Sequence, residues 1–312
     1  MIEIIARSEA MSEAVRLADR VAGTDANVLI TGESGVGKDA LAFYIHSRSA
    51  RATQSFVKID CATLPSGLLE AELFGYERGA FTGAAEEKPG RLEASHRGTL
   101  VLDEIAHLSI ESQAKLLRVI ETREFERLGG RKLIKVDARL IALTNVDLGD
   151  AVKRRQFRED LYYRLHVVQI NVPPLRARAG DLPELARAFA RNYAAKHGRQ
   201  ASDVSREALA LLGDYEFPGN VRELANTIER AVIVSSARQV ELSDLPDSIR
   251  AAVRLQRHRL KPQTLAEVEA EYVAEILAVA KGNKTEAARL LGISRKSLHE
   301  RLARRERLKD EG

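Results

Sequence analysis

Eight consecutive residues near the N-terminus have the composition of a phosphate-binding loop. They follow the pattern G-x-x-x-x-G-K, except that Asp39 stands where the general pattern has Ser or Thr. Glycines let backbone N–H groups close around phosphate oxygens, and Lys38 can reach the terminal phosphates. The alternative is an ordinary glycine-rich turn. The residues predicted to bind a nucleotide are Gly32, Glu33, Ser34, Gly35, Val36, Gly37, Lys38 and Asp39.

A pair of adjacent carboxylates supplies the second half of such a site. Asp103 and Glu104 follow an apolar run at 99–102, and open α/β sheets bind ligands at the carboxyl ends of their strands. We expect Asp103 to hold Mg²⁺ through a water molecule and Glu104 to orient and deprotonate the attacking water. Acidic pairs at strand ends also occur as solvated caps. It is the combination with Lys38 that predicts binding and hydrolysis of ATP.

Strands alternating with helices are expected around these residues. A β-prone run at 26–31 precedes the loop, and residues 39–47 follow it with helical spacing. Alternation of this kind is typical of a mainly parallel, doubly wound α/β sheet. The further apolar runs that we expect to be strands lie at 56–59, 99–102, 139–144 and 167–172.

The strand pattern stops after Pro173 and Pro174. Helical periodicity then dominates, which predicts a small helical domain. The stretch 246–262 is rich in arginine and closes with a proline, so we interpret it as an interdomain connection whose helicity stays open. The predicted helices of the small domain are 182–195, 206–212 and 221–235.

Composition restricts the class of protein. The chain has 312 residues, of which 45% are hydrophobic, and this predicts two or three packed domains. No run approaches the roughly 18 apolar residues of a membrane span, and the N-terminus lacks an apolar signal core. We therefore expect a cytoplasmic protein with no membrane partner. The single cysteine, Cys61, excludes an intramolecular disulfide and a zinc site made of several cysteines.

The C-terminal part of the chain is basic and patterned as helices. Residues 250–312 carry a formal charge of +6, against −2 for the rest of the chain, and nucleic-acid contacts need such a local basic surface. A capping-box pattern at 264–267 opens one helix, a short helix is expected at 285–291, and Ser294 can cap a last helix through residue 305. This order predicts a helix-turn-helix that binds DNA.

The last of these helices has one apolar side and one polar side. Leu298 and Leu302 share the side that we expect to be core. Residues early in a recognition helix reach base edges, and later basic residues more often meet phosphates. Any one of the polar residues could equally be solvated. The five predicted to face DNA are Arg295, Lys296, Ser297, His299 and Arg301.

One loop motif gives the chain a resemblance to a known family. Residues 79–84 read G-A-F-T-G-A and resemble the loop that marks sigma-54-dependent transcription activators of the NtrC type. The resemblance extends from about residue 5 to residue 308, and the C-terminal helices resemble the Fis-type module of that family. It implies that Phe81 and Thr82 contact sigma-54. Two glycines at a flexible tip and an exposed Phe agree with a protein contact, whereas a Phe folded into a local core is the alternative.

The same resemblance assigns further residues one by one. Arg158 and Arg164 match two arginines that reach the γ-phosphate of the neighbouring subunit. Asn145 matches a sensor of the γ-phosphate at a strand end, and Arg222 matches a second sensor on the helical lid. Without the resemblance, each of the four would more simply be a surface or turn residue.

Two positions depart from these patterns. Asp39 replaces the Ser or Thr of general phosphate loops, and the family usually has Glu there, so an acidic residue suits the family. Asp60 stands where many members have an Asn that restrains the catalytic Glu. An Asp cannot donate the amide hydrogen bond of an Asn, so a restraint of Glu104 by Asp60 requires a shared proton or a bridging partner.

These features together predict an AAA+ P-loop motor, a helical lid and an all-α DNA-binding domain. The predicted boundaries are 1–175 for the α/β ATPase subdomain, 176–246 for the lid, 247–263 for a basic linker and 264–312 for the Fis-type helix-turn-helix. The family implies a hexameric ring, with a dimer as an inactive form, that binds enhancer double-stranded DNA. The resemblance also implies that this ring uses ATP and Mg²⁺ to remodel the closed complex of sigma-54 RNA polymerase into the open complex.

Two other functions stay open at this stage. One is an AAA+ remodeller outside transcription, against which Phe81, Thr82 and the terminal helix-turn-helix argue; a sigma-54 open-complex assay separates the two. The other is a DNA-binding regulator with a degenerate ATPase, which measurable ATP turnover excludes. No receiver or ligand-sensing domain precedes the motor in this chain. Either a separate partner controls the protein, or the sequence is a piece of a longer one.

Overall fold

The computed structural model describes residues 4–260, 265–280, 282–299 and 301–302. Backbone contacts divide the chain into two units, Met1–Pro246 and Asp247–Gly312. No helix within the described residues is long and apolar enough to cross a membrane.

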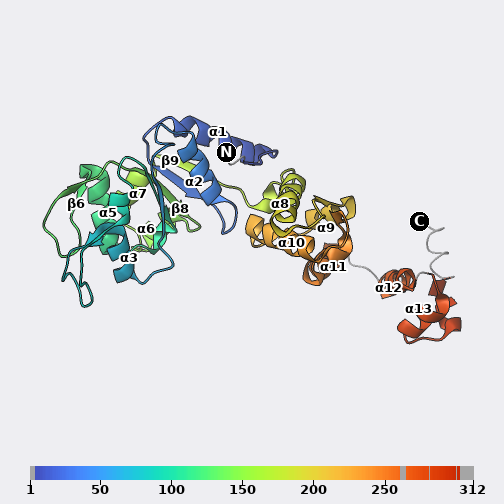
Figure 1. Cartoon of the computed structure of the whole chain (residues 1–312). Helices are drawn as coiled ribbons and strands as arrows, with labels where there is room; N and C mark the ends of the chain where they lie inside the picture. The colour runs from blue at the N-terminus through green and yellow to red at the C-terminus, as the bar shows by residue number, and fades with distance from the viewer. Residues whose placement is uncertain (1–3, 261–264, 281, 300, 303–312) are drawn as a thin grey trace. The chain divides into compact units, whose positions relative to one another are not determined.

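A five-stranded, all-parallel sheet forms the centre of the first unit (Figure 1). Its strand order is β2-β5-β8-β1-β9, so the connections between its strands are crossovers that carry helices. The five strands predicted from the sequence are confirmed to within two residues at each end. Their bounds are β1 Val28–Thr31, β2 Phe56–Asp60, β5 Thr99–Asp103, β8 Arg139–Thr144 and β9 Val168–Asn171.

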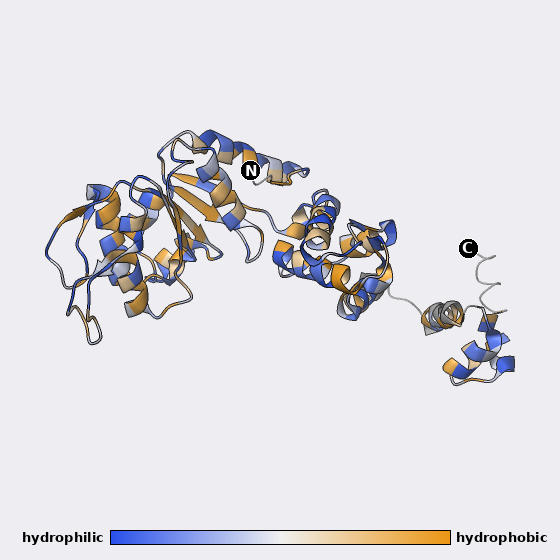
Figure 2. Ribbon diagram, viewed as in Figure 1, coloured by the Kyte–Doolittle hydropathy of each residue, from blue (hydrophilic) through white to orange (hydrophobic). Residues whose placement is uncertain are grey.

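Strand side chains alternate between two hydrophobic layers. In β1, Leu29 packs into one layer, and Val28 and Ile30 pack into the other. Apolar residues therefore line the strands on both faces of the sheet (Figure 2). Burial on both faces explains why the strands read as continuous apolar runs in the sequence.

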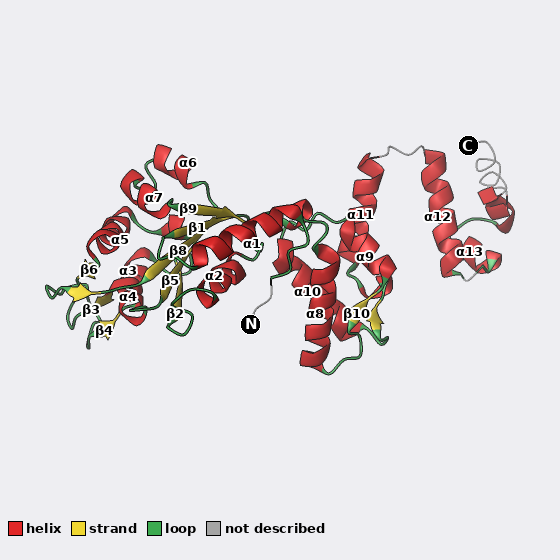
Figure 3. Cartoon of the chain, turned by 90° about the horizontal axis from the view of Figure 1, so that it is seen from above, coloured by secondary structure: helices red, strands yellow, loops and turns green. Residues whose placement is uncertain are grey.

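Helices cover both faces of this sheet (Figure 3). Two of them, α1 and α2, share the layer of Val28 and Ile30, and α3, α5, α6 and α7 share the layer of Leu29. The doubly wound α/β prediction is confirmed. The helices are α1 Glu9–Ala22, α2 Lys38–Ser47, α3 Ser66–Phe74, α4 Arg91–Ala94, α5 Ile110–Thr122, α6 Leu148–Lys153 and α7 Glu159–Leu165, with a 3-10 turn at Ile105–His107.

Two short antiparallel hairpins accompany the central sheet. In the first, β3 (Gly75–Tyr76) pairs with β4 (Lys88–Pro89), and in the second, β6 (Glu124–Phe125) pairs with β7 (Ile134–Lys135). A bridge from Tyr76 to Leu128 joins the two hairpins. We call residues 77–87, which connect β3 to β4, the GAFTGA loop.

The helical lid predicted after the sheet is confirmed. Its helices enclose a separate hydrophobic core that includes Phe217, Leu224 and Ile228. Gly198 ends the first helix in a left-handed conformation, and the Ser205 hydroxyl caps the second. The elements are α8 Leu182–His197, α9 Arg206–Gly213 and α10 Asn220–Val234, the strand pair β10 Asp203–Val204 and β11 Gln239–Val240, and 3-10 turns at Leu175–Ala177 and Leu242–Asp244.

A buried carboxylate joins the start of the chain to the start of the lid. Asp181, directly before α8, accepts hydrogen bonds from the backbone N–H groups of Arg7 and Ser8, at 2.5 and 2.7 Å. It also accepts one from the Ser8 hydroxyl, whose own oxygen caps α1. One side chain thereby fixes the entry to α1 against the entry to α8.

The second unit is helical. It contains α11 (Asp247–Leu260), α12 (Leu265–Val279) and α13 (Lys284–Leu290), and residues 295–299 and 301–302 are also helical. The stretch 246–262, whose helicity the sequence left open, is thus helical over Asp247–Leu260. Asn283 caps α13, and the Ser294 hydroxyl accepts the N–H of Ser297 as an N-cap does. Thr264 and residues 303–305 of the predicted helices lie outside the described residues.

Candidate nucleotide site and partner surfaces

The predicted nucleotide residues meet at the carboxyl edge of the central sheet. Strand register sets Asp60 level with Asp103 and Thr31 level with Thr144, so the segments that follow all leave from one edge. A cavity of about 240 Å³ opens there. It is lined by Ser34, Gly35, Gly37, Lys38, Asp39, Ala40, Asp103, Glu104 and Arg222.

Two glycines of the phosphate loop, Gly32 and Gly35, have no room for a side chain, whereas Gly37 has open space around it. A Cβ on Gly32 would lie 2.6 Å from the carbonyl oxygen of Val172, and one on Gly35 would lie 2.4 Å from that of Gly219. Both residues have positive φ, as does Gly37, which begins α2 in a left-handed conformation. The loop conformation is therefore enforced by the backbone packed against it.

Lys38 is buried and points back into its own loop. Its Nζ donates hydrogen bonds to the carbonyl oxygens of Gly32 and Glu33, at 2.8 and 3.2 Å, and lies 3.8 Å from Oε1 of Glu104. Burial lowers the pKa of this ammonium, while the nearby carboxylates, Glu104 first, act in the opposite direction. The charge thus sits where phosphate oxygens would enter the loop.

A lysine not singled out from the sequence joins two acidic residues of the cavity. Nζ of Lys58, on β2, lies 2.8 Å from Oδ2 of Asp103 and donates a hydrogen bond to Oδ1 of Asp39. Partial burial lowers the pKa of Lys58, but the hydrogen bonds with the two carboxylates outweigh it, so the pKa is raised overall. Lys58 stays charged between these residues.

Glu104 is held by the backbone that follows β8. Its φ of 51° is left-handed, and its Oε2 accepts the backbone N–H of Asn145 at 3.2 Å. Asp60 uses its Oδ1 to accept the N–H of Ala62 at 2.9 Å. Within the described residues no hydrogen bond joins Asp60 to Glu104, so the predicted restraint stays a prediction.

The lid closes over the phosphate loop through polar contacts. Arg222 Nη1 donates to the Ser34 hydroxyl at 3.0 Å, and the buried Asn220 side chain donates to Glu33 at 3.0 Å. Glu33 also accepts two hydrogen bonds from Arg176, at 2.8 and 2.5 Å. The Arg176 hydrogen bonds, followed by that of Asn220, lower the pKa of Glu33 to about 2. Arg222 thus lies in the cavity, as its predicted sensor role requires.

Arg178, which like Arg176 was not predicted from the sequence, contacts the backbone of the phosphate loop. Arg178 is 3% exposed and donates to the carbonyl oxygen of Val36 at 2.6 Å. Burial lowers the pKa of its guanidinium, and Asp181 acts in the opposite direction. Neither Arg176 nor Arg178 has a periodicity or motif signal. The sequence did contain a signal for Lys58, because residues two apart on a strand share a face and Asp60 was already a candidate.

The two candidate arginine fingers lie outside the cavity of their own chain. Arg158 pairs with Asp160 at 2.7 Å, and Arg164 pairs with Glu121 at 3.2 Å. The side chains of Arg158 and Arg164 are 38% and 59% exposed. Neither arginine is among the described residues that line the cavity. To reach a neighbouring molecule, each arginine would have to give up one surface ion pair, which solvent screens.

The GAFTGA loop carries its predicted contact residues at the surface. Gly79 and Gly83 have φ values of 81° and 109°, and a Cβ on either would meet nothing within 4 Å. The Phe81 side chain is 42% exposed, and its ring packs edge-on against Tyr76 with centroids 5.0 Å apart. Thr82 is exposed. Phe81 is thus neither fully exposed nor part of a closed core.

The second hairpin supports this loop through one arginine. Arg127 makes a bidentate pair with Glu93, at 2.8 and 2.9 Å, and contacts Glu77 and Glu87 at 3.2 Å each. The Arg127 guanidinium lowers the pKa of Glu93. Both ends of the GAFTGA loop are therefore tied to one guanidinium.

The predicted DNA-facing residues all lie on the second unit's last described helix. Arg295, Lys296 and His299 are exposed, and Leu298 is buried as predicted. Ser297 is half-buried, and so is Arg301, which pairs with Glu269 of α12 and hydrogen-bonds the Ser297 hydroxyl. Arg301 would have to give up these contacts to reach a phosphate.

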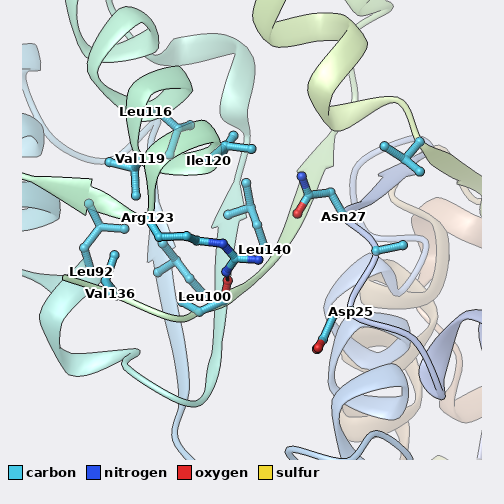
Figure 4. Close-up of a pocket in the computed structure, with 13 residues that line it drawn as sticks. Asp25, Asn27, Leu92, Leu100, Leu116, Val119, Ile120, Arg123, Val136 and Leu140 are labelled. Carbon is cyan, nitrogen blue, oxygen red and sulfur yellow. Dashed lines mark hydrogen bonds between the residues drawn. The ribbon is translucent and has the colours of Figure 1, made fainter.

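A second cavity lies at the opposite edge of the sheet. Figure 4 shows aliphatic side chains such as Leu100, Leu116 and Leu140 gathered around the extended side chain of Arg123. The Arg123 guanidinium donates to Oδ1 of Asp137 at 3.2 Å and to the carbonyl oxygen of Ala138 at 3.0 Å. This cavity, of about 230 Å³, contains none of the residues predicted to bind nucleotide.

Three family models match successive segments of the chain between residues 4 and 304. Residues 4–171 match the sigma-54 interaction domain, residues 176–261 match the AAA+ ATPase lid domain, and residues 264–304 match the Fis family of bacterial regulatory proteins. The chain belongs to the sigma-54-dependent transcription activators. The activator thus has an AAA+ ATPase domain and a DNA-binding helix-turn-helix.

Characterised relatives resemble the activator over nearly all of its length. The transcriptional regulatory protein FlbD of Caulobacter vibrioides is 42% identical, across 96% of this chain and 69% of FlbD. The formate hydrogenlyase transcriptional activator FhlA of Escherichia coli is 44% identical, across 97% of this chain and 44% of FhlA. The crystal structure of NtrX from Brucella abortus in complex with ATP is 36% identical with a TM-score of 0.71, across 97% of this chain and 69% of NtrX. The activator therefore spans about half to two thirds of the length of these relatives.

Proposed function

We propose that this activator works in the cytoplasm as a hexameric ring that binds enhancer DNA, hydrolyses ATP and remodels the closed complex of sigma-54 RNA polymerase into the open complex. The observation that carries the proposal is the separation of two sites in one unit. The nucleotide cavity holds Lys38, Asp103 and Glu104, while Phe81 and Thr82 lie in the exposed GAFTGA loop.

The cavity residues divide the hydrolysis between them. Lys38 neutralises phosphate charge, and Arg222 approaches the nucleotide from the lid. Glu104, fixed by the N–H of Asn145, orients the attacking water and accepts its proton. The side chain of Asn145 is assigned to sensing the γ-phosphate.

The donor set suits Mg²⁺. Asp103 and Asp39 both bind the single ammonium of Lys58, and carboxylate oxygens are the ligands that Mg²⁺ prefers. We assign Asp103 to hold Mg²⁺ through water. When bound with the nucleotide, Mg²⁺ neutralises charge that develops on the phosphates.

Ring assembly follows from the two arginines outside the cavity. Arg158 and Arg164 can stabilise negative charge at the γ-phosphate only in another subunit's site, since neither lines its own. A closed ring gives every site such a neighbour. We assign a dimer to the inactive state.

The test of the proposed function uses Thr82→Ala. We expect the variant to keep ATP turnover within about twofold, because Thr82 lies outside the cavity, and to lose sigma-54 binding, because an exposed contact residue is removed. Sigma-54 capture is measured with a transition-state mimic of ATP hydrolysis, and promoter opening by open-complex assay. Thr53→Ala, at an exposed turn, is the control. Normal capture and opening by Thr82→Ala would remove the loop as the coupling element.

A further inference from the structure

One lysine on the edge strand occupies the centre of the acidic part of the cavity. Lys58 reaches from β2 to Asp39, in the first turn of α2, and to Asp103, at the end of β5. Its side chain is 36% exposed and that of Asp103 only 15%. A single ammonium therefore links the helix that follows the phosphate loop to the strand that ends at Asp103.

The position of this ammonium is set by the strand register. Lys58 lies level with Val101, and Asp60 lies level with Asp103. Val101 belongs to the hydrophobic layer covered by α2, so Lys58 leaves β2 toward the helix that carries Asp39. The contact is a consequence of the fold as well as of side-chain length.

The positive charge of Lys58 reduces the repulsion between the Asp39 and Asp103 carboxylates. Two carboxylates within hydrogen-bonding distance of the same nitrogen repel each other unless a cation separates them, and the attraction of a cation at such distances is large when solvent is partly excluded. Either an ammonium or a divalent cation meets this need. Both together would place like charges side by side.

We propose that Lys58 is a placeholder cation: it holds Asp39 and Asp103 in place while Mg²⁺ is absent, and Mg²⁺ displaces it when it enters with the nucleotide. This inference rests on the proposed Mg²⁺ site. It assigns Lys58 as a positioning residue, which acts through the two carboxylates and touches neither ATP nor the attacking water.

A displaced Lys58 has one further carboxylate beside it, that of Asp60. Both residues line a wider hollow of about 530 Å³, in which Glu72 already pairs with Lys88 and Arg91. Asp60 lies two residues along the same strand and on the same face. The Asp60 carboxylate could therefore neutralise the displaced ammonium.

The experiment uses Mn²⁺ as a spectroscopic probe of the metal site in the whole chain. Free Mn²⁺ is followed by electron paramagnetic resonance, with and without ADP, for the wild type and Lys58→Met. We expect Lys58→Met to bind Mn²⁺ without nucleotide at least about tenfold more tightly than the wild type, because one opposing charge is removed. Its thermal unfolding midpoint should fall in EDTA and recover with Mn²⁺.

Matched variants separate charge from packing. Lys58→Arg keeps the charge and should bind Mn²⁺ as the wild type does. Lys58→Gln removes the charge but keeps a polar side chain. It should bind Mn²⁺ as tightly as Lys58→Met, and it takes the place of that variant if Lys58→Met folds poorly. Lys115→Met removes a lysine that pairs with Glu70 at 2.7 Å outside the cavity, and should change nothing.

The outcomes distinguish this inference from the function it rests on. If the wild type with ADP binds no Mn²⁺, or if Asp103→Asn binds it equally well, the proposed Mg²⁺ site is wrong and the placeholder fails with it. If that site is present but Lys58→Met and Lys58→Gln bind Mn²⁺ no more tightly than the wild type, only the placeholder role is wrong.

Discussion

Two glycine-rich segments of the first unit differ in what holds them. In the phosphate loop, a Cβ on Gly32 or Gly35 would collide with backbone oxygens at 2.6 or 2.4 Å. In the GAFTGA loop, a Cβ on Gly79 or Gly83 would meet nothing within 4 Å, although both residues have positive φ. The first loop is fixed by its neighbours, and the second only by its local conformation. The loop proposed to bind phosphate is therefore confined at two glycines, and the loop proposed to contact sigma-54 is unconfined at both of its glycines.

The largest expected effect is on ATP turnover, at Glu104, which we propose as the base beside the phosphate loop. Glu104→Gln should lower ATP turnover by about 10²–10⁴-fold, because an amide cannot accept the proton of the attacking water. Affinity for ATP should stay nearly unchanged. Steady-state turnover and nucleotide titration measure the two quantities, and Glu111→Gln, at an exposed position, is the control. Wild-type turnover would remove Glu104 from this role.

Removing the buried ammonium of Lys38 should weaken ATP binding and not only slow ATP turnover. For Lys38→Ala we expect ATP affinity to fall about 100-fold, because a partly desolvated charge next to the phosphates is lost. Titration with a fluorescent ATP analogue measures this, with Lys115→Ala for comparison. An unchanged affinity would contradict the assignment of the phosphate loop.

The comparison of the two loops can be tested directly with one pair of variants. Gly35→Ala should weaken ATP binding about tenfold, because its methyl group displaces the loop from Gly219, at a cost of order 1–3 kcal/mol. Gly83→Ala introduces strain at φ 109° only in the GAFTGA loop, and should leave ATP affinity within about twofold. Equal losses in the two titrations would abolish the distinction.

The smallest expected effect concerns stability against pH. The pKa of Glu33 is about 2 in the folded chain, below the ordinary 4.5. Its ion pair with Arg176 therefore stabilises the fold above about pH 4.5, and the contribution is lost as the pH falls toward 2. Because the pair is exposed, Glu33→Gln should lower the free energy of unfolding at pH 7 by about 1 kcal/mol or less. Urea unfolding at pH 7 and at acidic pH should show the difference from wild type shrinking; a constant difference would exclude the ion pair as its source.

The fold was largely predictable because its signals are local. Short continuous apolar runs, such as 26–31 before Gly32, located the strands. The nucleotide loop and the acidic pair were found because each is continuous in sequence. Contacts between distant segments left no such trace: the pairing of Arg301 with Glu269 depends on how two helices pack.

The same limit applies inside the site. Lys58 meets Asp39 and Asp103 only because three separate elements converge at one sheet edge. The exposed Phe81 side chain packs against the ring of Tyr76, at the base of the hairpin, and no sequence pattern indicated this contact. Sequence patterns identify residue types suited to a task, but long-range packing decides which of them are neighbours.

The carboxylate of Asp181 has a mechanical consequence. Because it binds the N–H groups of Arg7 and Ser8 directly before α8 begins, tension applied to the chain at residue 7 reaches the first turn of the lid without passing through the sheet. The load path consists of three hydrogen bonds onto one side chain. A displacement of this end would therefore also displace the start of the lid, the element that carries Arg222 over the phosphate loop.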